Sequence, residues 1–294
     1  MKTFAIVIFL LSLASATYAQ VSHGVVKEGL TMDSKILGTK VRYTIYLPFD
    51  YETSSRLYPV VYLLHGYTDN DMAWIQFGEA NLIADEAIAN REIPSMIIAM
   101  PDGGASWFIN SYNGSVRYED FFFQEFMSYI ESHYRIRHEK RYRGVAGLSM
   151  GGFGTLVYAM RHPDAFAACA ALSAAVNTTD QIVAMDDRAW SASWPTTVYG
   201  PGSGEGRLTE HLLSYNPIHI VETSDAEKLK SVRIYIDCGD DDYLTIGNAM
   251  LHVALTQKQI PHEYRVRDGA HTWGYWRSGL MDALKFIGSS FHKP

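Results

Sequence analysis

A serine in the middle of a glycine-rich segment is the residue of this sequence best suited to act as a nucleophile. The segment reads Gly147-Leu148-Ser149-Met150-Gly151, after an apolar stretch that predicts a strand and before a pattern that predicts a helix over residues 154–161. A serine at such a sharp turn has a strained backbone that exposes its hydroxyl, and the small residues beside it leave room for the neighbouring strand and helix. The alternative interpretation is an ordinary glycine-rich turn.

A serine hydroxyl reacts poorly near neutral pH, so a base must take its proton and a third group must orient that base. His271 is the candidate base. Among the eleven histidines it alone follows the last predicted strand, on a loop that would return to the end of the sheet beside Ser149.

The orienting acid should follow the strand that precedes the histidine's strand. The sequence there offers Asp237, Asp240, Asp241 and Asp242. The order serine, acid, histidine along the chain is that of α/β-hydrolases. Spacing alone does not choose among the last three aspartates. A calcium loop is the competing interpretation, but the alternate ligand spacing and closing glutamate of an EF-hand are missing.

Attack on an ester carbonyl creates an oxyanion, and backbone N–H groups must already point at it. The amide of Met150, directly after the nucleophile, is one candidate donor. The amide of Tyr67 is the second, because it follows a predicted strand and the flexible Gly66. A metal-binding role for His65 is weakly supported, since no His-Glu-x-x-His spacing occurs, and we expect no metal.

Alternating extended and helical patterns must position these residues. Near-continuous apolar runs, typical of strands buried on both faces of a parallel sheet, predict strands over residues 41–47, 59–64, 95–100, 144–148, 166–172, 232–236 and 263–266. Apolar residues at three-to-four spacing predict helices over 118–134, 244–257 and 276–291. We therefore expect a three-layer α/β domain with its chemistry at the carboxyl ends of the strands. Residues 177–231 are interpreted as an insertion, which either roofs the site or packs as an ordinary excursion.

The N-terminus has the pattern of a secretory signal peptide over residues 1–19. Lys2 precedes an apolar run of about ten residues, about half of what spans a bilayer, and small residues precede the cleavage point. We expect a secreted or periplasmic protein with a single catalytic domain over residues 20–294 and no stable membrane insertion after cleavage. An uncleaved membrane anchor is the alternative.

Composition limits the classes of binding partner, the size of the core and the state of the cysteines. The formal net charge is −7 and the basic residues are scattered, which argues against a nucleic-acid partner. Hydrophobic residues make up 47% of the chain, enough for one large core. The two cysteines, Cys169 and Cys238, fall in predicted strands, and we expect free buried thiols rather than a disulfide bridge.

With these pieces together, the chain resembles the esterase D-like branch of the α/β-hydrolases, which contains feruloyl and acetylxylan esterases of carbohydrate esterase family 1. The resemblance extends from about residue 24 to the C-terminus. It rests on several motifs in the same order: Tyr46-Leu47-Pro48, Leu63-Leu64-His65-Gly66, Ala105-Ser106-Trp107-Phe108, Tyr118-Glu119-Asp120-Phe121, Gly147-Leu148-Ser149-Met150-Gly151-Gly152-Phe153-Gly154, Cys238-Gly239-Asp240-Asp241-Asp242 and Gly269-Ala270-His271-Thr272-Trp273.

The resemblance implies an α/β-hydrolase fold, a mostly parallel central sheet flanked by helices with an insertion between core strands. It puts the family's Gly-x-x-Asp acid on Asp242 and its oxyanion donors on Tyr67 and Met150. The aspartate-rich run departs from the more usual mixed residues after Gly239, so a neighbouring aspartate stays an alternative.

The function implied is a secreted serine carboxylesterase that hydrolyses feruloyl or acetyl esters of plant polysaccharide through an acyl-enzyme, without a cofactor. Export favours a substrate met outside the cell over the cytosolic thiol metabolite of an S-formylglutathione hydrolase. That thioesterase, a siderophore esterase, an acyltransferase and an inactive carbohydrate-binding relative are the alternatives. Trp107 and Trp273 flank the predicted site and could contact the substrate or simply pack. The oligomeric state stays open.

Overall fold

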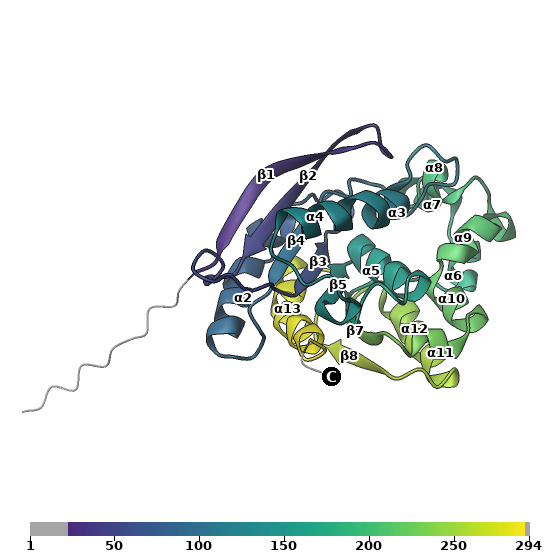
Figure 1. Cartoon of the computed structure of the whole chain (residues 1–294). Helices are drawn as coiled ribbons and strands as arrows, with labels where there is room; N and C mark the ends of the chain where they lie inside the picture. Colours follow the sequence, from purple (N-terminus) through teal and green to yellow (C-terminus); the bar gives the residue numbers. More distant parts are fainter. Residues whose placement is uncertain (1–22, 292–294) are drawn as a thin grey trace, which may run out of the picture.

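An eight-stranded, mostly parallel sheet runs through the centre of the protein (Figure 1). The computed structural model describes residues 23–291, so the predicted signal peptide lies outside the described residues. The strands are β1 (Val25–Ser34), β2 (Thr39–Leu47), β3 (Val60–Leu64), β4 (Ile97–Pro101), β5 (Arg143–Leu148), β6 (Ala168–Leu172), β7 (Arg233–Gly239) and β8 (His262–Arg267). Their order across the sheet is β1-β2-β4-β3-β5-β6-β7-β8. Only β1 and β2 are antiparallel to their neighbours, and the predicted α/β fold is confirmed.

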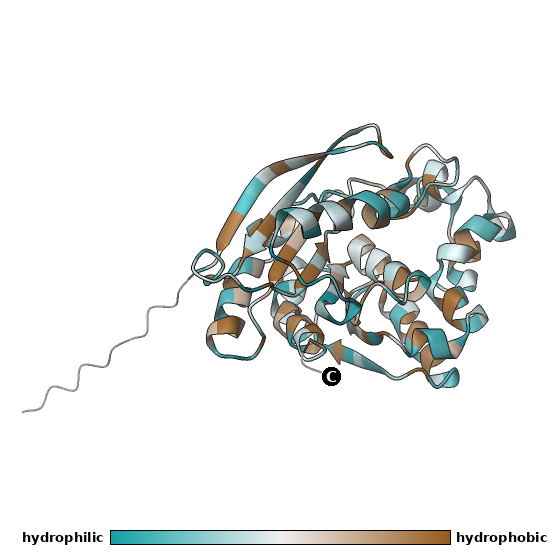
Figure 2. Cartoon of the chain, viewed as in Figure 1, coloured by the Kyte–Doolittle hydropathy of each residue, from teal (hydrophilic) through white to brown (hydrophobic). Residues whose placement is uncertain are grey.

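The central strands form where the sequence has apolar runs. Every residue of β3, β4 and β6 is buried, as expected for strands covered on both faces. Figure 2 shows brown, hydrophobic segments concentrated in the interior of the molecule. The edge strand β1 was not predicted. Its residues are mostly exposed, and a bulge interrupts its pairing with β2. Its sequence therefore shows no regular alternation of apolar and polar residues that would predict a strand.

Helices cover both faces of the sheet. They are α1 (Ala73–Gln76), α2 (Ala80–Ala89), α3 (Tyr118–Phe121), α4 (Met127–His133), α5 (Met150–Arg161), α12 (Thr245–Gln257) and α13 (Trp273–Gly288). A π-helical turn, Phe122–Phe126, joins α3 to α4, where the sequence predicted one unbroken helix. The hydrophobic side chains of α2 and α13 pack in one core cluster, and those of α3 to α5 and α12 pack in a second cluster on the other face. The three layers therefore form as predicted.

Two helices begin earlier than the sequence predicted. The helix after the serine starts at Met150 rather than at residue 154, and the last helix starts at Trp273 rather than at residue 276. In both cases the early start lies next to a candidate catalytic residue. The side chain of Thr272 accepts a hydrogen bond from the amide of Tyr275 and so caps the last helix directly after His271.

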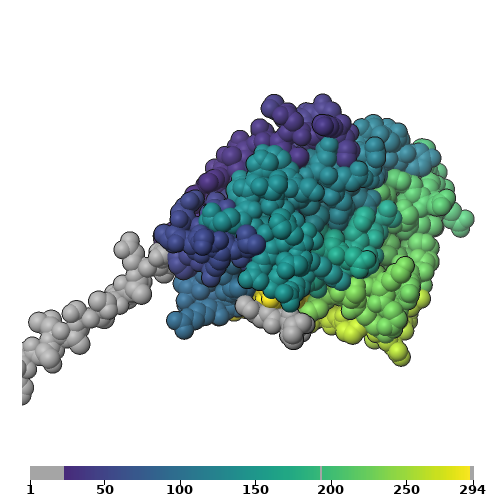
Figure 3. Space-filling view, viewed as in Figure 1, coloured from purple at the N-terminus to yellow at the C-terminus, as the bar shows by residue number. Residues whose placement is uncertain are grey.

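Six short helices fill the chain between β6 and β7, where the insertion was predicted. They are α6 (Thr179–Ala184), α7 (Asp187–Ser193), α8 (Thr196–Tyr199), α9 (Glu210–Tyr215), α10 (Pro217–Thr223) and α11 (Ala226–Leu229). The space-filling view shows this green segment lying against the teal segment of the chain (Figure 3). Inside it, the rings of Trp190 and Trp194 stack with centroids 5.6 Å apart, and Arg207 is buried and paired with Asp187.

Two expectations about chemistry outside the site can be checked. Cys169 on β6 and Cys238 on β7 are free and buried, as predicted. Burial raises the pKa of both thiols to about 12, so neither is an activated nucleophile.

Within residues 23–291, the helices are too short or too polar to cross a bilayer.

The glycines of the serine turn have a packing role that can be measured. A Cβ on Gly151 would lie 2.4 Å from the carbonyl oxygen of Leu64 and 2.5 Å from that of His65, so α5 can approach β3 only without a side chain there. We expect Gly151→Ala to lower the free energy of unfolding by about 2 to 3 kcal/mol. Gly274→Ala is the matched control, because a Cβ on Gly274 in α13 would make only an ordinary contact, 3.9 Å from the hydroxyl of Thr272, and it should be neutral or stabilising by up to about 1 kcal/mol. Urea denaturation measures both; equal stability of the two variants would contradict this account.

Candidate active site

Ser149 sits at the turn between β5 and α5 in a strained backbone conformation with positive φ: φ is +53° and ψ is −116°. Its amide donates to the carbonyl of Leu172 at 2.9 Å, and its own carbonyl accepts from the amides of Phe153 at 2.9 Å and Ala175 at 3.0 Å. These bonds hold the strained residue between β6 and α5, and the side chain stays partly exposed. The local geometry therefore matches the turn expected from the sequence.

The structure brings together three side chains that are far apart in the sequence. Ser149 Oγ lies 2.9 Å from His271 Nε2, and His271 Nδ1 lies 2.8 Å from Asp242 Oδ2. His271 comes from the loop between β8 and α13, and Asp242 from the loop after β7. Because β5, β7 and β8 are all parallel, these loops meet at one end of the sheet (Figure 1).

The carboxyl group of Asp242 is buried yet ionised. Burial by itself raises the pKa of Asp242, but the hydrogen bonds from His271 and from the amide of Leu244, together with the nearby Ser173 hydroxyl, outweigh it and lower the pKa. The Leu244 bond is 2.9 Å long and uses Oδ1, which leaves Oδ2 for the histidine. An anionic acceptor on Nδ1 keeps the lone pair of Nε2 directed at the serine.

The candidate oxyanion donors, the amides of Met150 and Tyr67, belong to two segments that both lie next to Ser149. Met150 is the first residue of α5, a position whose N–H has no partner within its helix. Tyr67 follows Gly66, and a Cβ built on Gly66 would lie 3.8 Å from Cβ of Ser149, so the loop after β3 runs close to the nucleophile. The two segments that carry the candidate amides are therefore neighbours.

His65 has a positioning role that the sequence reasoning missed. Its ring is buried and bridges two loops: Nδ1 lies 2.7 Å from the carbonyl oxygen of Gly66, and Nε2 accepts from the amide of Gly103 at 2.8 Å. The ring is therefore neutral, with its proton on Nδ1. The Gly66 carbonyl belongs to the same planar peptide as the Tyr67 N–H and points the opposite way. Fixing that carbonyl thus aims the candidate oxyanion donor.

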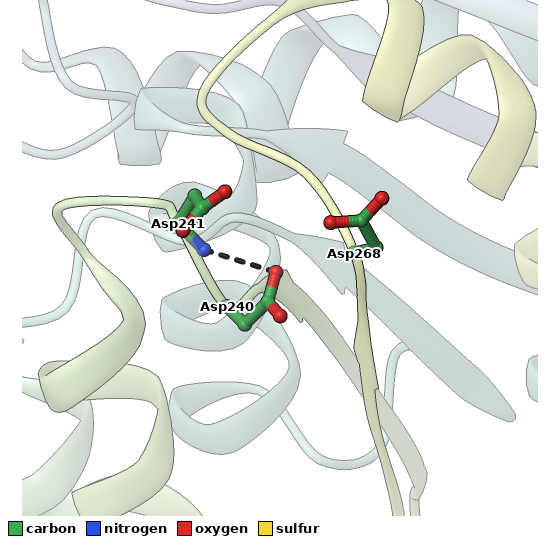
Figure 4. A group of neighbouring side chains, drawn as sticks. All are labelled: Asp240, Asp241 and Asp268. Carbon is green, nitrogen blue, oxygen red and sulfur yellow. Dashed lines mark hydrogen bonds between the residues drawn. The ribbon is translucent and has the colours of Figure 1, made fainter.

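The loop after β7 that carries Asp242, called the acid loop here, also contains Asp240 and Asp241. Neither of these carboxylates contacts His271. Figure 4 shows Asp240 and Asp241 near Asp268, with all three carboxylates exposed. Asp240 Oδ1 accepts from the amide of Asp241 at 3.1 Å and from that of Gly269 at 3.0 Å. Asp240 therefore ties the acid loop to the loop that carries His271. Exposed acidic groups of this kind are common without a metal ion.

The two predicted tryptophan contacts differ in exposure. Trp107 is 5% exposed, and its ring stacks on that of Trp194 with centroids 4.6 Å apart, which favours a packing role for it beneath the insertion. Trp273 is half-buried and packs against Trp74 and the exposed Phe77.

Sequence reasoning also missed Tyr243. It is 72% exposed, and its ring centroid lies 4.7 Å from that of His271. The place of Tyr243 directly after Asp242 in the sequence is the signal that could have identified it as a neighbour of the site.

Comparisons with known proteins agree with this geometry. The family model described as "Putative esterase" matches residues 34–287. Esterase MT1326 of Mycobacterium tuberculosis is 31% identical over 256 residues, which cover 81% of this chain and 54% of that protein. The endo-1,4-beta-xylanase/feruloyl esterase of Xylanibacter ruminicola is 30% identical over 169 residues, which cover 55% of this chain and 23% of that protein. The chain thus spans about half the length, or less, of these two curated relatives.

A solved structure of a ferulic acid esterase superposes with a TM-score of 0.78 at 35% identity, and the match covers 92% of this chain and 99% of that one. The region that the family model matches, residues 34–287, contains the serine turn, the acid loop and the histidine loop. The chain therefore belongs to the esterase family.

Proposed function

We propose that this protein is a serine carboxylesterase that forms an acyl-enzyme on Ser149. The observation that carries this proposal is the continuous hydrogen-bonded chain from Ser149 through His271 to Asp242, with distances of 2.9 Å and 2.8 Å. Those distances are within the range for direct proton transfer between a nucleophile and its base. Membership of the esterase family supports the same chemistry.

In the first half of the reaction, His271 Nε2 takes the proton of Ser149 as Oγ attacks the ester carbonyl carbon. Asp242 holds the imidazole in the required tautomer and stabilises the imidazolium. The amides of Tyr67 and Met150 donate to the oxyanion, and the imidazolium then passes its proton to the leaving alcohol oxygen. In the second half, His271 activates a water molecule, which attacks the acyl carbon and releases the acid and the free serine. The reaction needs no group beyond these residues and water.

The substrates proposed are feruloyl or acetyl esters of plant polysaccharide. Similarity to proteins named ferulic acid esterase and endo-1,4-beta-xylanase/feruloyl esterase supports this class. The signal-peptide pattern of residues 1–19 supports it as well, because a secreted or periplasmic enzyme meets polymeric esters outside the cytoplasm. Tyr243 presents exposed aromatic surface beside His271 on which a sugar or an aromatic acid could stack, and Trp273 lies in the first turn of the helix after His271.

Replacing the nucleophile tests the mechanism directly. Ser149→Ala should reduce turnover of an activated ester by about 10⁶-fold, because the attacking oxygen is removed, while the unfolding transition stays at its wild-type temperature. A fluorophosphonate probe should label the wild-type protein at Ser149 and leave the variant unlabelled. Wild-type turnover by Ser149→Ala would refute the mechanism.

Three neighbouring aspartates provide a matched series for the acid. Asp242→Asn should lower kcat by about 10⁴-fold, because the neutral amide no longer selects the productive histidine tautomer. Asp240→Asn and Asp241→Asn are the controls and should stay within about threefold of wild type. Both carboxylates are exposed and do not contact His271, and asparagine keeps the side-chain oxygen with which Asp240 accepts from the amides of Asp241 and Gly269. Steady-state kinetics on one soluble ester measures all three. A larger loss for Asp240→Asn or Asp241→Asn than for Asp242→Asn would reassign the acid.

The substrate class is tested by comparing methyl ferulate, acetylated xylan and an S-acyl glutathione thioester under the same conditions. We expect kcat/KM for one of the two oxygen esters to exceed that for the thioester by at least about tenfold, which corresponds to about 1.4 kcal/mol in transition-state binding. A preference for the thioester would favour the S-formylglutathione hydrolase alternative. Faster capture of the acyl group by an added sugar alcohol than by water would make the protein an acyltransferase.

A further inference from the structure

A second aspartate, Asp237 on β7, lies five residues before Asp242 and is completely buried. Its carboxylate accepts hydrogen bonds from the hydroxyl of Tyr235 at 3.0 Å, from Nε and Nη2 of Arg267 at 2.9 Å and 3.2 Å, and from the hydroxyl of Tyr275. A buried carboxylate must be satisfied in this way to stay ionised. None of these groups takes part in the reaction steps above.

Two of the donors flank the loop that carries the candidate base. Arg267 is the last residue of β8, and Tyr275 lies in the first turn of α13, so the loop with His271 leaves the sheet at one Asp237 donor and enters the helix at the other. Arg267 Nη2 also donates to the carbonyl of Tyr275 at 3.3 Å, and the guanidinium lies 4.0 Å from the centroid of the tyrosine ring. Both ends of the loop are thus fastened to one carboxylate.

The same carboxylate belongs to the strand that ends in the acid. Pairing of β7 with β8 sets Gly239 opposite Arg267, directly before the acid loop and the histidine loop begin. A Cβ on Gly239 would lie 2.0 Å from the carbonyl oxygen of Gly269, and one on Gly269 would lie 2.6 Å from the ring of Tyr275. The two loops therefore touch, and the tyrosine ring packs over their contact.

We propose that Asp237, through Arg267 and Tyr275, is a positioning residue that holds His271 at hydrogen-bonding distance from Asp242. The proposal rests on the catalytic role assigned to His271 above. The network fixes both ends of the histidine loop relative to β7, and Asp242 is fixed to the same strand. Loss of either flanking bond removes one of the contacts that fix the loop relative to β7, while the bond between Asp240 and the Gly269 amide remains.

The phenols supply a matched pair of variants. Tyr275→Phe removes the hydroxyl that ties α13 to Asp237, whereas Tyr235→Phe removes a hydroxyl from the same carboxylate but lies on β7 itself and holds no part of the loop. Both variants keep the aromatic ring and the Arg267 ion pair. We expect Tyr275→Phe to lower kcat by about 10- to 100-fold with little change in KM, because small misplacements of a catalytic group have effects of this size. Tyr235→Phe should stay within about twofold of wild type.

A spectroscopic measurement separates positioning from general stability. The Nδ1 proton shared by His271 and Asp242 gives a strongly downfield proton resonance when it is protected from exchange, and a His271→Ala sample identifies it. This resonance should weaken or move upfield in Tyr275→Phe and persist in Tyr235→Phe, at a temperature where both are folded by circular dichroism. It reports on the geometry whether or not esters are hydrolysed, so failure of the proposed function would be seen separately, as an inactive wild-type protein with an intact resonance.

Arg267→Lys provides a second route if Tyr275→Phe does not fold. Lysine keeps the charge but loses the two-pronged contact with Asp237, so kcat and the resonance should fall as in Tyr275→Phe. Equal kcat and equal resonances in Tyr275→Phe and Tyr235→Phe would overturn the proposal, as would a wild-type resonance in Arg267→Lys. In those cases the network would serve stability alone.

Discussion

The strained backbone of Ser149, with its positive φ, is the constraint on which the rest of the site depends. A non-glycine residue in this region costs on the order of 1 to 3 kcal/mol and persists only where its surroundings hold it. Here the amide and carbonyl of Ser149 bond to Leu172, Phe153 and Ala175, so β6 and α5 together keep the turn in place. Because α5 starts immediately, the amide of Met150 is left free of helix bonds beside the nucleophile. The strain therefore accounts for both the partly exposed hydroxyl and one candidate oxyanion donor.

The second candidate oxyanion donor, the amide of Tyr67, depends on a different buried polar group. Only a neutral imidazole can donate to the Gly66 carbonyl and accept from the Gly103 amide at once, and His65 is surrounded so that it does both. The loop after β3 is thereby joined to the loop after β4, and the peptide that contains the Tyr67 N–H cannot rotate. The two candidate donors thus come from separate strands, and each is preorganised by contacts that exist before any substrate binds.

Much of this arrangement could be predicted from the sequence, and the remainder could not for identifiable reasons. The apolar runs that form β3 to β7 and the position of His271 after the last strand are local signals, so the α/β fold was expected. The edge strand β1 carries no hydrophobic period, and the early start of α5 is imposed by packing against β3 rather than by propensity. The choice of Asp242 over Asp240 and Asp241 required a family resemblance, because three adjacent carboxylates differ only in which way the folded loop turns them. The roles proposed for His65 and Asp237 depend on partners more than 25 residues away, which no local pattern records.

Asp237 and Asp242 illustrate how one strand and its loop can supply two carboxylates with different duties. The oxygens of Asp237 are occupied by two phenols and a guanidinium, and the positive charge of Arg267 offsets its negative charge within the same buried network. Asp237 therefore has no free lone pair to offer the imidazole and adds little net charge near it. Among residues 23–291 the ion-pair contact of Asp242 is with His271 alone, and Asp242 keeps one oxygen for that ring while the Leu244 amide holds the other. The acid that is only partly satisfied by fixed groups is the one able to respond when the histidine takes up a proton.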